Sequence, residues 1–390
     1  MKKKLAIITS HPIQYNVPLY RALSARGVVD VRVFYTWGRQ VMEEKFDPGF
    51  GKVVKWDIPL LDGYESQFLV NRSLRPGSDH YKGIHNPDIL RELDAWQPDA
   101  LLVYGWNFKS HLAVMRHYSR RLPVFFRGDS TLLNDRPGIR SIVRKFALRW
   151  VYGHVDKAFY VGVNSKNYFL RANMKESQLV FAPHAVDNDF FGDKDGAYSR
   201  RALEWRRELG IPDDAIVFLY AGKLEPVKSL STLVGVFNRP TMPADAHLVV
   251  VGNGPLEGEL KKTAASDRIH FLGFQNQGNM PVVYRLGDIY VLPSVSETWG
   301  LAINESMACG RPVIASSQCG GTADLIKEGK TGYSFRAGDE DDLEKKVTLM
   351  LKDRPALAEM GRNALQHIQG FSITRIAGAI EKAVLDAGSK

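Results

Sequence analysis

Short apolar runs alternate with helix-length segments along almost the whole chain of 390 residues. This alternation is typical of parallel α/β layers, in which the connecting helices bury the strands on both faces. Strands in the first half are expected at Lys4–Thr9, Val31–Tyr35, Ala100–Tyr104, Val124–Arg127, Lys157–Val161 and Leu179–Ala182. The helices expected between them are Val17–Ala25, Asp88–Trp96, Lys109–Tyr118, Ile139–Gly153 and Ser165–Ala172.

A second α/β series begins near residue 213, and the boundary between the two is expected within Asp187–Pro212. Its strands are expected at Ile216–Tyr220, His247–Val251, Arg268–Leu272, Ile289–Leu292, Val313–Ala315 and Gly332–Phe335. Its helices are expected at Lys228–Phe237, Pro255–Ala264, Pro281–Leu286 and Leu301–Cys309, followed by a helical tail, Glu340–Ala387, with breaks at Pro355 and Gly370. Only the region Gln40–Tyr81 departs from the pattern; it has weak strand signals near Val53–Trp56 and Gln67–Val70. The chain is long enough for two or three domains.

The composition is that of an ordinary soluble globular protein, with 44% hydrophobic and 24% charged residues. No segment approaches the roughly 20 apolar residues that span a bilayer. The start, MKKKLAII, resembles a signal peptide but is read as a first buried strand, because its apolar stretch is too short. The two cysteines, Cys309 and Cys319, indicate reduced thiols in the cytoplasm and provide no metal site.

The positive charge is concentrated in the first half of the chain. Residues 1–190 contain 28 Lys and Arg against 18 Asp and Glu, whereas residues 191–390 contain 24 against 25. An anionic membrane, a phosphate-linked acceptor and nucleic acid all fit a basic first half.

One basic segment has amphipathic spacing. Basic residues recur at Arg136, Arg140, Arg144 and Lys145, opposite the apolar residues Ile139, Val143, Phe146 and Trp150. Peripheral contact with an anionic membrane fits this pattern, and so does a helix with a buried apolar face and a solvated basic side.

The run SETWGLAINESMACGRPVIAS contains two carboxylates, Glu297 and Glu305, separated by seven residues. It joins the apolar strand Asp288–Leu292 to a small-residue helix. Gly300 allows close approach of a ligand, and the amides of Leu301 and Ala302 stand at a helix start, which is a ready anion site. The two carboxylates can accept hydrogen bonds from the hydroxyls of a sugar and a ribose. The alternative is a surface turn with two solvated acids.

Other strand ends in the second half carry lysines and glycines. Lys223 and Lys228 flank a short loop between a strand and a helix, where two ammonium groups would neutralise a diphosphate. Glycines 252, 254 and 258 follow another apolar strand. A dinucleotide fingerprint is disfavoured there, because Glu257 stands where a Gly or Ala is required and the next strand, RIHFLGF, ends without an acid.

These segments are similar to the motifs of retaining glycosyltransferases of family 4, also called glycosyltransferase group 1. Glu297 and Glu305 match the family's E-x7-E signature. Lys223 and Lys228 match its G-[RK]-L-x3-K-G pattern, with Ser229 replacing the last Gly. The run VGNGP matches its VGxGP turn, and PHAVDNDFF resembles its P-N-G-V-D segment. The resemblance covers residues 222 to about 332, and the first half only in outline.

The resemblance implies a GT-B fold with two Rossmann-like domains facing each other across a cleft. Residues 1–190 would form the acceptor domain, residues 370–390 would pack back on it, and residues 191–369 would bind the nucleotide sugar. The implied reaction transfers a sugar from a nucleotide-diphosphate sugar, UDP favoured, to a hydroxyl of a glycan, a lipid-linked molecule or a small molecule, with retained configuration. Surface-polysaccharide or lipid-linked glycan synthesis would be the setting. No metal and no further cofactor are expected.

The resemblance also implies roles for individual residues. The implied catalytic residues are Lys223, Lys228, Glu297 and Asp129. Glu297 would orient the sugar and Glu305 the ribose. The implied donor-binding residues are Gly222, Gly252, Gly254, Phe274, Gln275, Thr298, Gly300, Leu301, Ala302 and Glu305.

The acceptor side is expected at strand ends in the first half, since open α/β sheets bind ligands at the carboxyl ends of their strands. The candidate residues are His11, Gln14, Tyr15, Trp106, Asn107, His111 and Arg127, beside Asp129, which stands where the family commonly has a His. The first loop lacks the Gly-Gly pair of many members.

Other functions stay open at this point. A GT-B sugar-nucleotide epimerase shares the architecture and donor type. A nucleic-acid-binding protein would use the basic first half, although the sequence has no clustered aromatic platform for stacking. A silent sugar-nucleotide-binding module would bind without turnover. The D-x-D of metal-dependent transferases, spelled by Asp187 and Asp189, is rejected because no other acid-rich loop supports a metal, and Asp187 is expected to be a turn or cap residue.

Overall fold

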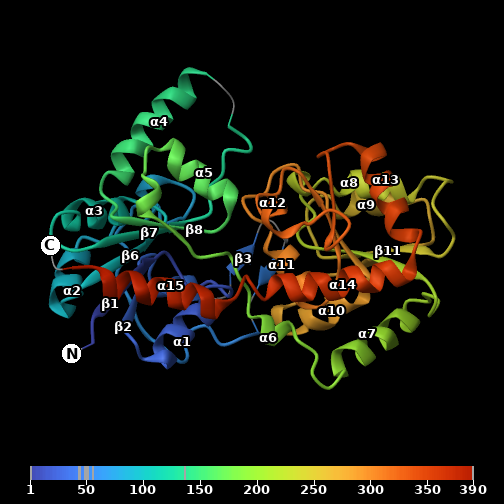
Figure 1. Ribbon diagram of the computed structural model, residues 1–390, viewed down its shortest axis with the longest axis horizontal. Helices are drawn as coiled ribbons and strands as arrows, with labels where there is room; N and C mark the ends of the chain where they lie inside the picture. The colour runs from blue at the N-terminus through green and yellow to red at the C-terminus, as the bar shows by residue number, and fades with distance from the viewer. Residues whose placement is uncertain (1, 43–44, 48–51, 55–56, 136–137, 389–390) are drawn as a thin grey trace. The chain divides into compact units, whose positions relative to one another are not determined.

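The computed structural model describes residues 2–42, 45–47, 52–54, 57–135 and 138–388, and the chain forms two compact units (Figure 1). The first unit comprises Met1–Glu44, Pro59–His184 and Ile373–Lys390. The second comprises Lys45–Ile58 and Ala185–Ser372.

The first unit is built on a seven-stranded parallel sheet with the strand order β5-β2-β1-β6-β7-β8-β9. The strands are β1 Lys4–Thr9, β2 Asp30–Tyr35, β5 Glu65–Phe68, β6 Ala100–Tyr104, β7 Val124–Gly128, β8 Lys157–Tyr160 and β9 Leu179–Phe181. Central strands such as β1 and β6 are almost continuously apolar because helices cover both faces of the sheet. The chain reverses its direction of progress between β1 and β6, and such switch points are where doubly wound sheets bind ligands.

The helices of the first unit include one from the far end of the chain. They are α1 Val17–Arg26, α2 Ile89–Trp96, α3 Lys109–Tyr118, α4 Ile139–Tyr152, α5 Val163–Arg171 and α15 Ile373–Asp386. Helix α15 lies beside α1 (Figure 1), where Arg26 donates to Glu381 at 2.8 Å and Lys3 Nζ donates to the carbonyl of Ala387 at 2.5 Å. The last helix is therefore part of the first unit although the second unit precedes it in the sequence.

The second unit has a six-stranded parallel sheet with the order β12-β11-β10-β13-β14-β15. Its strands are β10 Ile216–Ala221, β11 Ala246–Val251, β12 Ile269–Leu272, β13 Ile289–Leu292, β14 Val313–Ser316 and β15 Gly332–Phe335. A two-stranded antiparallel ribbon, β3 Lys45–Asp47 and β4 Lys52–Val54, belongs to the same unit. The strand order is that of a Rossmann sheet, with its switch point between β10 and β13.

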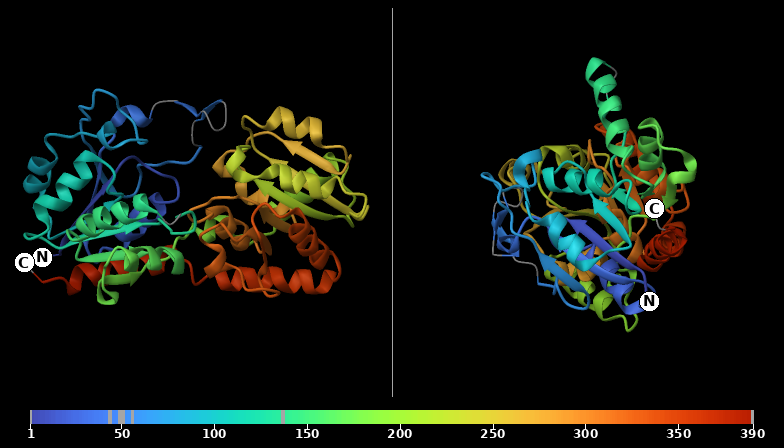
Figure 2. Two further views of the ribbon diagram at one scale, coloured as in Figure 1. Left: turned by 90° about the horizontal axis from the view of Figure 1, so that it is seen from above. Right: turned by 90° about the vertical axis from the view of Figure 1, so that its left-hand side faces the viewer.

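Nine helices among the described residues complete the second unit. They are α6 Asn188–Phe191, α7 Ala197–Glu208, α8 Leu230–Phe237, α9 Glu257–Thr263, α10 Met280–Leu286, α11 Leu301–Ala308, α12 Thr322–Leu325, α13 Glu340–Leu351 and α14 Arg354–Ile368. Figure 2 shows how the helices cover the sheet of this unit on both faces.

The sequence predicted twelve of these strands at nearly their observed positions, and the differences have physical causes. Helix α7 was missed within the expected boundary, because only Ala202 and Arg206 of this helix are buried and its pattern is mostly polar. The helical tail is interrupted near Pro355 and at Gly370, as expected, since α13 ends at Leu351, α14 spans Arg354–Ile368 and α15 begins at Ile373. Pro355 itself lies in the first turn of α14, where a missing N–H costs little, and Asp353 caps the helix at 3.0 Å from the amide of Ala356.

The irregular region of the first half also differs in detail. The signal near Val53–Trp56 corresponds to β4, although residues 55 and 56 lie outside the described residues. The signal near Gln67–Val70 corresponds to β5, which begins two residues earlier and pairs in parallel with β2. Within the described ranges, no helix is long and apolar enough to cross a membrane.

Candidate active site

Three loops meet at the carboxyl edge of the second unit's sheet, beside the switch point between β10 and β13. The loop after β10 is bonded to the loop after β11, because the amide of Leu224 donates to the carbonyl of Asn253 and the amide of Leu256 donates to the carbonyl of Leu224, both at 3.0 Å. It is also bonded to the loop after β13, where the amide of Val295 donates to the carbonyl of Val227 at 2.9 Å. Backbone hydrogen bonds therefore hold these loops in one fixed arrangement.

Glycines permit this close approach of backbones. A Cβ on Gly252, whose φ is +133°, would lie 2.0 Å from the carbonyl oxygen of Gly222, and a Cβ on Gly254 would lie 2.6 Å from that of Leu224. No side chain fits at either position without moving the neighbouring loop. The glycines predicted to approach a nucleotide therefore have a definite structural role, which is the contact between two loops.

Lys228 and Glu297 form an ion pair that joins the loops after β10 and β13. Both side chains are about one-fifth exposed, at 21% and 22%. Lys228 ends a short 3₁₀ turn, Pro226–Lys228, and the next residue, Ser229, has a left-handed φ of +49°. Glycine adopts that conformation without strain, which explains why the G-[RK]-L-x3-K-G pattern has a Gly at the position of Ser229. Lys223 lies on the same loop, and its carbonyl accepts a hydrogen bond from Tyr220 at 2.7 Å.

Helix α11 begins at Leu301, four residues after Glu297. Gly300 is the N-cap with a φ of +92°, and the amide of Ile303 donates to its carbonyl at 2.9 Å. The amides of Leu301 and Ala302 have no acceptor among the described residues. These two donors at a helix N-terminus can bind an anion.

The loop that carries Glu297 and Thr298 is fixed on its other side by the loop after β14. The amide of Glu297 donates to the carbonyl of Gln318 at 3.2 Å, and the amide of Gly320 donates to the carbonyl of Glu297 at 3.0 Å. The buried Trp299 donates through Nε1 to Asn304 at 2.8 Å. The position of Glu297 relative to the start of α11 is thus set by both flanking loops.

Glu305 lies one turn into α11 and accepts hydrogen bonds from the Tyr284 hydroxyl at 2.5 Å and from Gln277 at 3.5 Å. Burial raises the pKa of Glu305 to about 6, although both hydrogen bonds oppose this change. Near neutral pH the group is a carboxylate held in one orientation. It can accept hydrogen bonds from hydroxyl groups of a ligand.

Phe274 and Gln275 follow β12, at the same edge of the sheet. The amide of Phe274 donates to Asn253 Oδ1 at 2.5 Å, and Gln275 accepts from Asn279 at 2.8 Å. The structure thus places the predicted donor residues on consecutive strand ends of one unit: Gly222 and Lys223 after β10, Gly252 and Gly254 after β11, Phe274 and Gln275 after β12, and Thr298 to Glu305 after β13.

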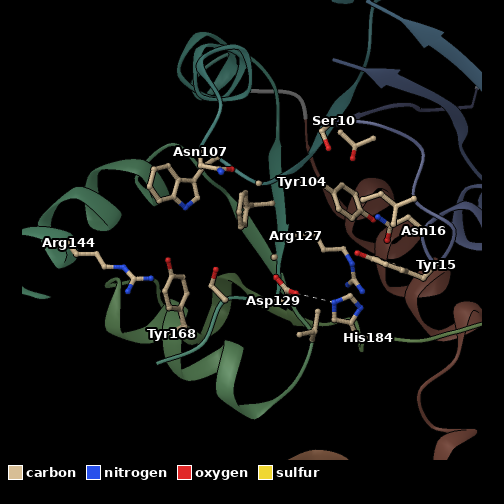
Figure 3. Close-up of a pocket in the computed structure, with 18 residues that line it drawn as sticks. Ser10, Tyr15, Asn16, Tyr104, Asn107, Arg127, Asp129, Arg144, Tyr168 and His184 are labelled. Carbon is tan, nitrogen blue, oxygen red and sulfur yellow. Dashed lines mark ion pairs between the residues drawn. The ribbon is translucent and has the colours of Figure 1, made fainter. Parts of the chain in front are cut away.

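The first unit contains a cavity of about 440 Å³ at the carboxyl ends of β1, β6 and β7, again beside the switch point (Figure 3). Five predicted residues line it: Tyr15, Trp106, Asn107, Arg127 and Asp129. Its lining is polar and aromatic, which suits a ligand with hydroxyl groups.

Two charged groups of this cavity are fixed by the segment after β9. The buried Arg127 donates to the carbonyls of Ala182 at 2.6 Å and Pro183 at 2.9 Å. His184 Nε2 lies 3.6 Å from Asp129 Oδ2, and Figure 3 shows the two side chains meeting. Burial lowers the pKa of His184, and Asp129 opposes this change. Asp129 is 43% exposed, so it is accessible to a ligand.

Three predicted acceptor residues do not line this cavity. His111 is completely buried, where it bonds Thr36 at 2.8 Å and the carbonyl of Gly105 at 2.9 Å; burial lowers its pKa to about 4, so it is a neutral structural side chain. His11 bonds Ser10 at 2.9 Å and packs edge-on against Trp37. Gln14 lies in the same loop, outside the cavity lining.

Sequence reasoning missed several lining residues. They are Ser10, Tyr104, Arg144, Tyr168 and His184, together with apolar and small neighbours. Ser10 and Tyr104 stand at the carboxyl ends of β1 and β6, so strand-end position alone could have found them. Arg144 and Tyr168 come from α4 and α5, and nothing local in the sequence marks them.

The D-x-D pair has a structural role, as predicted for Asp187. Its side chain accepts from the amide of Phe190 at 3.2 Å and so caps the short helix α6. Asp189 lies in the first turn of that helix.

Solved structures share this fold over almost the full chain. HepE of Anabaena in complex with UDP matches with a TM-score of 0.73, at 17% identity, covering 99% of this chain and 100% of that one. Sucrose-phosphate synthase from Thermosynechococcus elongatus matches with a TM-score of 0.72, at 19% identity, with the same coverage. The predicted class, a GT-B fold of two Rossmann-like α/β units, is confirmed.

Residues 202–367 match the family model described as Glycosyl transferases group 1. The second unit therefore resembles the group 1 glycosyl transferases in sequence, as the motifs predicted. A D-inositol 3-phosphate glycosyltransferase of Stackebrandtia nassauensis is 31% identical over 226 residues, which are 54% of this chain and 49% of that protein. An N-acetyl-alpha-D-glucosaminyl L-malate synthase of Bacillus anthracis is 26% identical over 263 residues, 66% of this chain and 65% of that protein. The chain thus spans about half to two thirds of the length of these curated relatives.

Proposed function

We propose that the protein is a retaining glycosyltransferase that moves a sugar from a nucleotide-diphosphate sugar to a hydroxyl group of an acceptor. UDP is the proposed nucleotide, and it is the one in the HepE complexes. The observation that carries the proposal is the ion pair of Lys228 and Glu297 beside the amides of Leu301 and Ala302, for which the described part of the chain offers no acceptor. A cation, two unpaired N–H donors and an oriented carboxylate in one place suit a sugar diphosphate better than any uncharged ligand.

Negative charge on the leaving diphosphate increases as the bond between the anomeric carbon of the sugar and the phosphate oxygen breaks. Lys228 and Lys223 on one loop and the amides at the start of α11 on another would stabilise this charge without rearrangement, because the loops are bonded together. Ion pairing with Glu297 holds the Lys228 side chain in place before the donor binds. A bound diphosphate would form an ion pair with Lys228 in place of Glu297. Glu297 would then be able to accept a hydrogen bond from the sugar.

Retention of configuration follows from an attack on the same face of the sugar from which the diphosphate leaves. In this proposal the acceptor oxygen itself bonds to the anomeric carbon as the bond to the phosphate oxygen breaks, and the leaving phosphate takes the proton of the acceptor hydroxyl, so no protein side chain acts as a nucleophile. Glu297 orients the sugar and Glu305 the ribose. The acceptor occupies the cavity of the first unit, where Asp129 and Asn107 provide hydrogen bonds to hydroxyl groups and Trp106 and Tyr15 provide aromatic faces.

The wider setting is also part of the proposal. The acceptor is a glycan, a lipid-linked molecule or a small molecule with a hydroxyl group, in surface-polysaccharide or lipid-linked glycan synthesis. The protein works in the cytoplasm, at the inner face of the membrane. No metal ion and no cofactor besides the donor takes part.

Calorimetric titration of the full chain with UDP, GDP and ADP tests the donor assignment first. We expect UDP to bind with at least tenfold preference over the other two, which is about 1.4 kcal/mol. Incubation with UDP-sugars and a panel of hydroxyl acceptors then tests the reaction, and proton NMR of the product reports the anomeric configuration. An inverted product would refute the retaining mechanism, and a donor converted to its epimer without acceptor would identify an epimerase.

A further inference from the structure

Helix α4 has apolar side chains on two opposite faces, and only one of them is buried. Leu148, Val151 and Tyr152 are between 2% and 5% exposed and pack into the core of the first unit. They anchor the helix to the sheet, while its opposite face points away from it. Figures 1 and 2 show α4 projecting from the rest of the first unit.

The opposite face is exposed and strongly apolar. The exposed fractions are 81% for Ile139, 58% for Ile142, 62% for Val143, 65% for Phe146 and 50% for Trp150. Positions 139, 143, 146 and 150 recur every three or four residues, so at about 100° per residue they lie in one line along the helix. A contiguous exposed patch of this kind marks an interaction surface, whereas scattered apolar residues do not.

Basic side chains border this patch, and Ile139–Tyr152 contains no acidic residue. Lys145 and Arg149 lie on one side of the apolar line and Arg144 on the other, and all three are exposed. Trp150 also has the guanidinium of Arg116 5.6 Å above its ring. An apolar line between two basic borders is the pattern of a helix that lies in the plane of a membrane surface.

We propose that this face of α4, formed by Ile139, Ile142, Val143, Phe146 and Trp150, docks on an anionic phospholipid membrane. The apolar side chains would enter the boundary between headgroups and acyl chains, and Lys145 and Arg149 would contact lipid phosphates, while Arg144 faces Asp135 at 3.8 Å and the Tyr168 ring. Trp150 suits this boundary because its ring is apolar and its N–H can reach water or a headgroup. A second copy of the chain fits the face less well, since two identical faces would bring their basic borders together.

The docking surface is connected to the cavity of the first unit. Arg144 belongs to α4 and also lines the cavity, where Figure 3 shows it beside Tyr168. A membrane-bound α4 would therefore hold one rim of the cavity at the lipid surface. On the proposed transferase function, which this step requires, the acceptor is a molecule carried by the membrane, with its lipid in the bilayer and its hydroxyl group in the cavity.

Vesicle sedimentation of the full chain tests the surface directly. The probes are vesicles of phosphatidylcholine alone and vesicles of two parts phosphatidylcholine to one part phosphatidylglycerol. We expect binding to the anionic vesicles only, and a loss of about tenfold or more in the double variant Val143→Glu, Phe146→Glu. The matched control is Leu74→Glu, because Leu74 is fully exposed in the same unit. This variant should bind vesicles like the wild type.

Two further measurements make the test specific. Lys145→Glu with Arg149→Glu should weaken binding to anionic vesicles, and added salt should do the same to the wild type. Brominated lipid should quench tryptophan fluorescence in the wild type, and most of this quenching should be lost in Trp150→Phe, a conservative change at a half-exposed ring.

Three results would overturn the proposal: a wild type that does not sediment with anionic vesicles, a Val143→Glu, Phe146→Glu variant that sediments like the wild type, or a dimer in light scattering that this variant dissociates. The last would assign the face to a second copy. Calorimetry with UDP reports the donor site in the other unit, so failure of the membrane surface and failure of the donor assignment give different results.

Discussion

The two units present their ligand edges in different ways. In the second unit, consecutive loops of one sheet edge are bonded backbone to backbone, and two glycines allow the contact. In the first unit, the cavity is lined by side chains from β1, β6, β7 and two helices, and its charges are fixed by the chain after β9. The backbone-bonded loops of the second unit tolerate few changes of sequence. The cavity of the first unit can change its lining one residue at a time.

This difference suits a division of labour between a common donor and a variable acceptor. A diphosphate and a ribose recur in nucleotide-diphosphate sugars such as those of UDP, GDP and ADP, so one rigid backbone site can serve many of them. An acceptor differs from one enzyme to the next, so its site is expected to consist of replaceable side chains on a conserved sheet. Four substitutions test whether the two units differ in this way.

The largest effect is expected for Lys228→Ala. It removes the cation proposed to stabilise the leaving diphosphate and leaves Glu297 without its partner. We expect the rate of transfer to fall about 10²–10³-fold, as for the loss of one preorganised group in an active site. Lys262→Ala, which alters an exposed lysine of the same unit, is the control and should keep the wild-type rate. Equal rates for the two variants would remove Lys228 from the mechanism.

The rigidity of the donor edge is tested by Gly252→Ala. The new Cβ would lie 2.0 Å from the carbonyl oxygen of Gly222, in a backbone conformation that alanine avoids. We expect the free energy of unfolding to fall by about 3 kcal/mol, measured in urea with a probe in the second unit. Gly258→Ala is the matched control on α9, since a Cβ there meets nothing within 4 Å, and it should stabilise the helix by up to about 1 kcal/mol. Similar unfolding midpoints for both variants would mean that the loops after β10 and β11 can separate freely.

Glu305 gives a pH-dependent prediction. Its pKa in the folded state is about 6 and its ordinary value is 4.5, so between these pH values the folded state holds more protons than the unfolded state. Stability contributed by the neutral carboxyl is therefore present below about pH 4.5 and is lost as the pH rises through 6. Between about pH 4.5 and 6, the free energy of unfolding of Glu305→Gln should rise by about 2 kcal/mol relative to that of the wild type. Glu359→Gln, at an exposed glutamate, should show no such change. A difference in free energy of unfolding between Glu305→Gln and the wild type that stays constant with pH would contradict the raised pKa of Glu305.

The smallest effect is expected for Asp129→Asn in the first unit. Asp129 is half-exposed and belongs to the cavity and not to the donor edge. Affinity for UDP should stay within about twofold of the wild type, while transfer to the acceptor should fall about tenfold through the loss of one hydrogen bond to a charged group. A large loss of UDP affinity in this variant would show that the division between the units is wrong.

The sequence predicted the second unit far better than the first unit's cavity, and the reason is physical. The predicted donor residues lie within short strand–loop–helix segments, so the spacing of Lys228, Glu297 and Glu305 along the chain already indicates which loops and helix start they share. The cavity brings together Asn16, Tyr104, Arg144 and His184, and only the strand order makes them neighbours. Local patterns contain no information on that order.

Burial explains the remaining differences. His111 looked like a ligand residue because it follows a strand, but it is the third residue of α3 and points into the core. The outer face of α4 shows the opposite case. The spacing of its apolar and basic residues fitted a helix with a buried apolar face as well as a helix that contacts a membrane. The high exposed fractions of Phe146 and Trp150 favour membrane contact. Arg136, which belonged to the same basic pattern, lies outside the described residues.

A crystal structure of the full chain with UDP is the most direct test of the donor site. The account predicts a diphosphate oxygen about 3 Å from Lys228 Nζ and another at the same distance from the amide of Leu301 or Ala302, with the ribose at Glu305. UDP bound elsewhere, or a diphosphate that leaves the Lys228–Glu297 pair and the start of α11 without contact, would contradict it.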